Sequence, residues 1–183
     1  MYKIAVFVSG GGSNLQAIID ACDSGKLNAT VCLVVSNKNT AFALERAEKS
    51  RIPNFCLTAE SEILATLEKF NPNIIFLAGY LKKIPPSILE KYDVYNIHPA
   101  LLPKYGGKGM YGINVHKAVL AAGESETGVT IHKIDSDYDK GTIIAQKKVA
   151  VLPNDTAETL AARVLAHENI FIVEVISQIL SEC

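Results

Sequence analysis

The sequence predicts an α/β fold in which an open, doubly wound, mostly parallel sheet has an antiparallel edge and helices on both faces. In the first half, short and continuously apolar runs alternate with helical segments, as in strand–helix–strand units. In the second half, strand-like segments at 128–134 and 142–149 are joined by a connection too short for a crossover helix, so we expect them to be antiparallel. We find no linker or repeat in the 183 residues, and we predict a single domain, 1–183.

The first half of the chain predicts five strands and four helices. The strands are expected at 3–8, 30–36, 54–57, 74–78 and 92–95, the last leading into Asn96 and His98. The helices are expected at 15–24, at 40–48 with Thr40 as the cap, from Thr58 or Ser61 to 70, and at 85–90. Gly25 and the Asn71-Pro72-Asn73 turn end the first and third helices, whereas Pro85-Pro86 opens the fourth, because proline suits the first helical turn.

The second half begins with a segment of different character. Residues 104–112 contain four glycines in nine positions and predict a surface loop, which is followed by a helix at 114–122. After the antiparallel strands, Asp155 and Glu158 have the spacing of a capping box and predict the start of a long helix that reaches the carboxyl terminus. Its expected apolar face is made of Leu160, Val164, Ile170, Val173 and Ile176.

The composition excludes several classes of partner. The formal net charge is −1 and there is no polybasic face, so we expect neither nucleic acid nor a membrane surface to bind by bulk electrostatics. We expect no membrane span and no signal peptide, because the first strand starts at once. The cysteines are scattered without zinc-ligand spacing, and Cys32 and Cys56 are expected to be buried thiols in strands, which predicts a reducing, cytoplasmic setting and no metal.

The most informative stretch joins the strand at 92–95 to two prolines, Pro99 and Pro103. Asn96 and His98 are two residues apart, so in extended backbone they project to the same side. This places an amide donor beside an imidazole at the carboxyl end of a strand, where open α/β sheets bind ligands. The pair suits a reaction in which negative charge develops on a carbonyl oxygen and a proton then moves.

A glycine-rich turn, Ser9 to Asn14, lies between the first strand and the first helix and predicts an anion site at a helix amino terminus. A Walker loop is excluded because it requires Lys-Ser or Lys-Thr after the last glycine, where this chain has Ser13-Asn14. A dinucleotide fingerprint is excluded because Leu15 stands at the position of its third glycine. What remains is a pocket for one phosphomonoester, held by the amides of Gly12, Ser13 and Asn14. The alternative is a turn that only lets helix and strand pack closely.

Three carboxylates, Asp135, Asp137 and Asp139, lie between the last two strands. A calcium loop is excluded because Lys140 and Gln146 stand where its glycine and glutamate are required. One carboxylate could lean on the imidazole of the strand-end pair, raising its pKa so that it donates a proton near neutral pH. The residue types do not indicate which of the three aspartates would do this. The alternative to a functional role is a solvated acidic turn.

Five segments together resemble the phosphoribosylglycinamide formyltransferases of purine synthesis. They are, in order, SGGGSNLQAIIDA, LAGYLKKIPP, YNIHPALLPKY, HKAVLAAGESETGVTIH and DKGTIIAQ. The resemblance covers nearly the whole chain and implies a formyltransferase-like fold. It also implies transfer of a formyl group from the co-substrate 10-formyltetrahydrofolate to the amine of glycinamide ribonucleotide, without a metal, in a monomer or homodimer.

The resemblance implies a role for each matching residue. Asn96 would hold the developing oxyanion and contact the folate, and His98 would be the general acid. Asp139, directly before Lys140-Gly141, would raise the pKa of His98 and order a water. The substrate would contact Gly12, Ser13, Asn14 and Glu168, and the folate would contact Leu81, Lys82, Lys83 and Ile84. His132 would support the same pocket, and Leu165 stands where a polar or basic residue often helps to hold the phosphate.

Four alternatives remain open at this point. A hydrolase acting on the same folate, or the formyltransferase of initiator methionyl-tRNA, would be expected to carry a further domain. A metal-dependent hydrolase could use His98, His116, His132 and Asp139, but the chain has no HxxxH or HxxEH helix. The fourth alternative is a non-catalytic phosphate-binding module. In such a module we would not expect the strand-end pair and Asp139 to lie together.

Overall fold

The computed structural model, which describes residues 1–135, 139 and 141–182, contains one seven-stranded sheet. The strands are β1 (Tyr2–Val8), β2 (Ala29–Ser36), β3 (Asn54–Cys56), β4 (Ile74–Leu77), β5 (Asp93–His98), β6 (Glu126–Lys133) and β7 (Ile143–Ala150). Their order is β3-β2-β1-β4-β5-β6-β7, with β5–β6 and β6–β7 antiparallel and every other pair parallel. This confirms the predicted mostly parallel sheet with an antiparallel edge.

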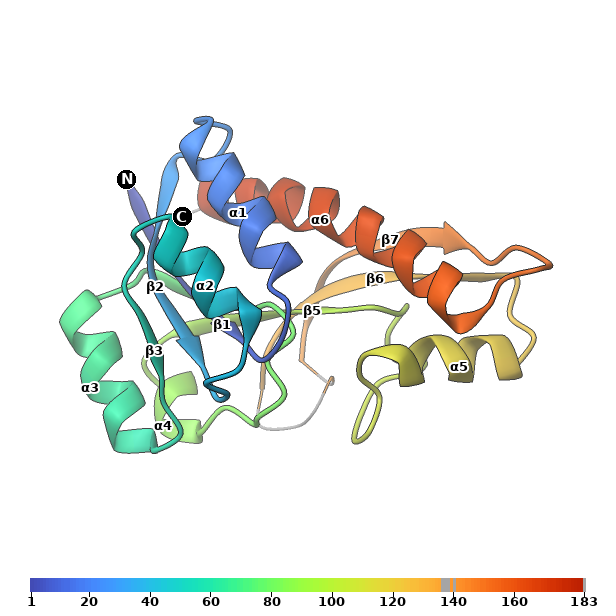
Figure 1. Cartoon of the computed structure of the whole chain (residues 1–183), viewed down its shortest axis with the longest axis horizontal. Coiled ribbons are helices and arrows are strands. Elements are labelled where there is room, and N and C mark those ends of the chain that lie inside the picture. The colour runs from blue at the N-terminus through green and yellow to red at the C-terminus, as the bar shows by residue number, and fades with distance from the viewer. Residues whose placement is uncertain (136–138, 140, 183) are drawn as a thin grey trace.

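Helices cover both faces of the sheet (Figure 1). They are α1 (Ser13–Asp23), α2 (Phe42–Lys49), α3 (Glu60–Phe70), α4 (Pro86–Leu89), α5 (Ile113–Ala121) and α6 (Ala157–Glu182). Because side chains alternate along a strand, Ile4, Val6 and Val8 of β1 pack in the core beneath α1, α2 and α6. Ala5 and Phe7 pack in the opposite core, beneath α3 and α4.

The helix starts differ from the predicted caps. Thr40 does not cap α2, since Ala41 occupies that position without a side-chain bond. The predicted box of Asp155 and Glu158 at α6 is also wrong. Thr156 and Thr159 exchange the reciprocal bonds instead, each backbone N–H donating to the other's hydroxyl at 2.9 and 3.2 Å.

The apolar side of α6 departs from the prediction in one position. Ile170 is 52% exposed, whereas its neighbours Phe171 and Ile172 are buried in the core. The stretch Ala157–Ser181 is also long and apolar enough to cross a membrane by length and composition alone, although we expected no membrane span from the sequence. In this structure that helix packs on the sheet through buried residues such as Leu160 and Ile176.

The cysteines are less buried than predicted. Cys56 is exposed because β3 is the edge strand of the sheet, and Cys32 is partly buried because the three-residue β3 pairs only with residues 34–36 of β2. Asp137 and Lys140, both named in the sequence analysis, lie outside the described residues. The parallel arrangement of β1, β4 and β5 brings their carboxyl ends to one edge, where Ser9, Ala78 and Pro99 begin the connecting loops.

Candidate active site

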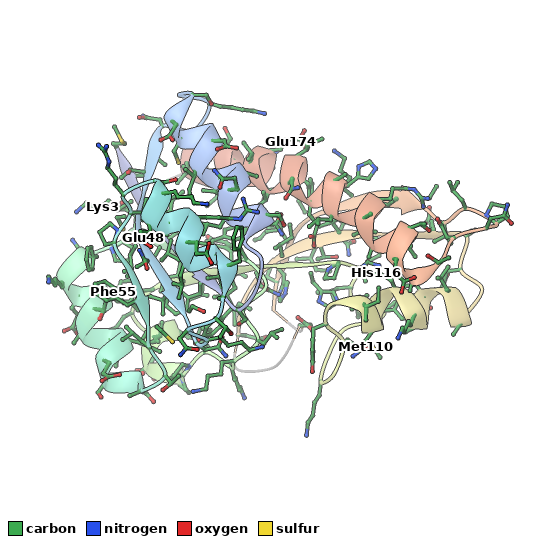
Figure 2. The ribbon with its side chains drawn as sticks, in the orientation of Figure 1. Lys3, Glu48, Phe55, Met110, His116 and Glu174 are labelled. Carbon is green, nitrogen blue, oxygen red and sulfur yellow. The ribbon has the colours of Figure 1, made fainter. Side chains whose placement is uncertain are left out.

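A cavity of about 620 Å³ opens at the carboxyl ends of β1, β4 and β5, the edge where open α/β sheets bind ligands. The predicted site residues that line it are Gly12, Ser13, Asn14, Leu81, Lys82, Lys83, Ile84, Asn96, His98, Asp139 and Glu168. The opposite wall includes Met110 of the glycine-rich loop and His116 of α5, both labelled in Figure 2. His132 is fully buried behind the cavity wall.

The imidazole of His98 is held between two groups. Its Nε2 donates to the carbonyl oxygen of Tyr105 at 2.8 Å, and its Nδ1 lies 3.8 Å from Oδ1 of Asp139. The other oxygen of Asp139 accepts a hydrogen bond from the N–H of Gly107 at 2.8 Å, so the glycine-rich loop fixes the carboxylate. The two residues are far apart in sequence, and the fold brings them to one end of the cavity.

The electrostatics of His98 differ from the sequence expectation. Burial lowers the pKa of His98 below its ordinary value, and this outweighs the carboxylate of Asp139 and the carbonyl of Tyr105, which both raise it. Burial alone would raise the pKa of Asp139. Hydrogen bonds from His132 and Gly107, together with the charge of His98, lower that pKa overall. Asp139 is therefore a carboxylate at neutral pH and favours the protonated form of His98.

Asn96 lies beside His98 on β5 and opposite His132 on β6, its cross-strand partner in the antiparallel register. The Nδ2 of Asn96 is 3.1 Å from Nε2 of His132, and that ring nitrogen is also 3.5 Å from Oδ1 of Asp139. This one nitrogen can accept from the amide or, in the other tautomer, donate to the carboxylate, so His132 contacts both groups from behind the wall of the cavity.

The other end of the cavity is the glycine turn before α1. Gly12 has φ +73°, and a Cβ on it would lie 2.6 Å from Cβ of Ala43, so no other residue fits there without strain. In the first turn of α1, Asn14 is buried and its Nδ2 donates to Oε2 of Glu168 at 3.3 Å. This bond joins the predicted phosphate loop to α6.

Burial raises the pKa of Glu168 to about 7, against the opposing hydrogen bond from Asn14. Between about pH 4.5 and 7 the unfolded chain ionises at this residue while the folded chain keeps the proton. The free energy of unfolding contributed by Glu168 therefore falls as the pH rises through that window, by about 3 kcal/mol. We expect Glu168→Gln to remove this part of the pH dependence, measured by urea unfolding at several pH values.

The difference between wild type and variant isolates Glu168 from His98 and His116, whose pKa values are lowered by burial and which act in the opposite direction. The matched control is Glu174→Gln, at an exposed carboxyl that Figure 2 shows on the outer side of α6. Parallel stability profiles for wild type and Glu168→Gln between pH 4.5 and 7.5 would contradict the assignment of a protonated Glu168.

The stretch predicted to receive the folate forms one rim of the cavity after β4. The backbone N–H of Leu81 donates to the hydroxyl of Ser9 at 2.9 Å, which ties this rim to the glycine turn. Nζ of Lys82 donates to the carbonyl of Thr58 at 3.1 Å, and Ile84 is buried in the core beneath. The rim therefore has a fixed backbone with lysine side chains along it.

Several groups at the site were not found from the sequence. The carbonyl of Tyr105 and the N–H of Gly107 are backbone groups, and the residue types at these positions do not predict their contacts with the site. His116 is buried and lines the cavity. Burial is the larger cause of its lowered pKa, and the charge of the neighbouring His98 lowers that pKa further. Within the described part of the chain, no group of three or more His, Cys, Asp or Glu residues is placed to hold a metal ion.

The comparisons with known proteins show which family the chain is similar to. The formyl transferase family matches residues 2–176. A chloroplastic phosphoribosylglycinamide formyltransferase of Arabidopsis thaliana is 44% identical over 98% of this chain, which spans 66% of that relative's length. The phosphoribosylglycinamide formyltransferase of Escherichia coli is 37% identical over 96% of this chain and 85% of its own length. The structure of glycinamide ribonucleotide transformylase 1 from Geobacillus kaustophilus superposes with a TM-score of 0.90, at 38% identity, over 98% of this chain and 99% of its own.

The family match over residues 2–176, on an open sheet with an antiparallel edge, places this chain among the formyl transferases. Within that class, the chain belongs to the phosphoribosylglycinamide formyltransferase family, to which its fold and sequence both match over nearly the full chain.

Proposed function

We propose that this protein transfers the formyl group of 10-formyltetrahydrofolate to the amine of 5′-phosphoribosylglycinamide, giving formylglycinamide ribonucleotide and tetrahydrofolate in purine synthesis. The observation that carries this proposal is one cavity with two chemically different ends. One end holds an amide, an imidazole and a carboxylate, from Asn96, His98 and Asp139. The other end is a glycine turn at a helix amino terminus, which suits a phosphate.

The proposed reaction needs only these side chains. The neutral amine of the substrate attacks the formyl carbon, and the new C–N bond converts the carbonyl into a tetrahedral oxyanion. The amide of Asn96 donates to that oxyanion, and the protonated ring of His98 passes its proton to it as general acid and takes the proton back as the carbonyl re-forms. As the bond from carbon to folate N10 breaks, the proton of the attacking amine passes to N10 through a water that Asp139 orders.

The contacts of His98 define how it can reach the substrate. Both ring nitrogens face protein groups, Nε2 the carbonyl of Tyr105 and Nδ1 the carboxylate of Asp139. A protonated ring satisfies both contacts, because each nitrogen then donates. We propose that the substrate oxygen takes the place of the Tyr105 carbonyl, so that Asp139 keeps its hold on Nδ1 and on the ring orientation.

The substrates divide the cavity between them in this proposal. The phosphate binds to the amides of Gly12, Ser13 and Asn14, and Glu168 contacts the ribose end of the same molecule. The folate binds along Leu81, Lys82, Lys83 and Ile84 and reaches Asn96 with its formyl group. We propose no metal, a single domain over 1–183, a cytoplasmic location, and a monomer or homodimer.

The test measures formyl transfer directly. The protein is mixed with a 10-formylfolate donor, with and without glycinamide ribonucleotide, and the absorbance of the deformylated folate is followed. We expect product only when the ribonucleotide is present. Equal product formation in its absence would mean hydrolysis with release of formate, and no product in either mixture would overturn the proposed function.

A further inference from the structure

We infer that Arg46 is a positioning residue for the phosphate site, holding the glycine turn so that its N–H groups face the cavity. This inference rests on the proposed function, because it concerns the phosphate end of the same cavity. Arg46 lies on α2, which packs against the turn and against the start of α1 (Figure 1). Arg46 is not among the residues that line the cavity, and any effect it has must pass through the turn.

Two successive carbonyls of the turn are bound to α2. The N–H of Ala43 donates to the carbonyl oxygen of Gly10 at 3.0 Å. Nε of Arg46 donates to the carbonyl oxygen of Gly11 at 2.8 Å, a charge-assisted hydrogen bond. Both carbonyls therefore point away from the cavity and toward α2.

The planarity of the peptide bond converts these contacts into a direction for the N–H groups. In a trans peptide the C=O and the following N–H point in opposite directions. With the carbonyls of Gly10 and Gly11 held by α2, the N–H groups of Gly11 and Gly12 must point away from α2, on the cavity side. The carbonyl of Gly12 accepts from the N–H of Gln16 at 2.9 Å within α1, so the N–H of Ser13 points out of the helix start. Three successive donors then face the cavity, and two of them, Gly12 and Ser13, are amides proposed to bind the phosphate.

The guanidinium of Arg46 is itself held in place. Its Nη1 donates to Oε1 of Gln16 on α1 at 3.2 Å, and its carbon lies 5.0 Å from the ring centre of Phe42. Among the described residues that line the cavity, the cations are Lys82, Lys83 and Lys108, and all belong to other loops. Arg46 thus adds a fixed positive charge behind the turn, which polarises the Gly11–Gly12 peptide and strengthens its N–H as a donor.

The test compares Arg46→Met with Lys49→Met. Lys49 is the matched control, because its cation lies 5.7 Å from the same Phe42 ring on the same helix but, among the contacts of the described residues, makes no bond to the turn. We expect Arg46→Met to raise KM for glycinamide ribonucleotide about 10- to 100-fold, the effect of losing a hydrogen bond to a charged group. KM for the formyl donor and kcat should change little, and this split shows that the variant is folded. Lys49→Met should behave as wild type.

Arg46→Lys keeps the charge but loses the planar fork, so it should raise KM less than methionine does. A second readout needs no turnover: inorganic phosphate is titrated into ¹⁵N-labelled protein while the amide resonance of Gly12 is followed. We expect a shift in wild type and Lys49→Met that is lost in Arg46→Met. Equal KM values in Arg46→Met and Lys49→Met, or a Gly12 shift that survives in Arg46→Met or is absent from wild type, would overturn the inference. Failure of the proposed function would appear separately, as wild-type turnover that does not depend on the ribonucleotide.

Discussion

Replacing His98 with alanine is expected to lower kcat/KM by about 10² to 10⁴ at neutral pH, because the reaction loses its proton-transferring group. The structure leaves no neighbour to take over this role. His132 is fully buried and engaged with Asn96 and Asp139. Burial is the larger cause of the lowered pKa of His116, and that cause remains when His98 is removed. Steady-state kinetics with both substrates would measure the loss.

The His98→Ala variant is expected to remain folded. The ring is 4% exposed but forms part of the cavity wall, so water can occupy the vacated space instead of an empty core void. The matched control is His167→Ala, at a half-buried histidine of α6 outside the cavity lining. Thermal unfolding of both variants checks the fold. Activity of His98→Ala within about tenfold of wild type would remove this residue from the mechanism.

The companion variant Asp139→Asn tests how His98 is kept protonated. The carboxylate raises the pKa of His98 while burial lowers it, so removing the negative charge lets burial dominate further. The protonated ring then persists only to a lower pH. We expect the fall of kcat/KM with rising pH to begin at a lower pH in Asp139→Asn than in wild type. Unchanged pH profiles would show that the two residues are not coupled.

The parts of the fold that the sequence predicted well are those whose physical cause is local. Strands such as β1 and β4 are buried on both faces, and their continuous apolar runs leave no other interpretation. The two-residue spacing of Asn96 and His98 places both on the cavity side, because side chains alternate along a strand. The choice of Asp139 came from the family resemblance, not from the residue types around it.

The parts that the sequence could not predict depend on distant backbone groups. The carbonyl of Tyr105 reaches His98 only because the glycine-rich loop folds back over β5. Arg46 has the appearance of an ordinary helix-surface cation, and its partner is the carbonyl of Gly11, 35 positions earlier. The lowered pKa of His98 could not be predicted either, because the burial that outweighs the effect of Asp139 exists only in the folded chain.

Replacing Asn96 with alanine is expected to lower kcat by about 10² to 10³, which is the usual effect of removing one donor to an oxyanion. The amide is placed by its cross-strand partner His132 at 3.1 Å, so its position is fixed before the oxyanion forms. Such a donor acts mainly on the transition state, and KM for either substrate should change little. Steady-state kinetics separate the two parameters.

Asn54→Ala is the matched control, because Asn54 lies in a parallel strand, donates only to the nearby carbonyl of Ile52 at 3.0 Å and does not line the cavity. A rise in KM for the folate with unchanged kcat in Asn96→Ala would mean that the amide binds the ground state and not the oxyanion. His98 would then be the single donor in the proposed site that faces the developing negative charge. The loss on removing His98 should in that case approach the upper end of its range, so the two variants together decide how the stabilisation is divided.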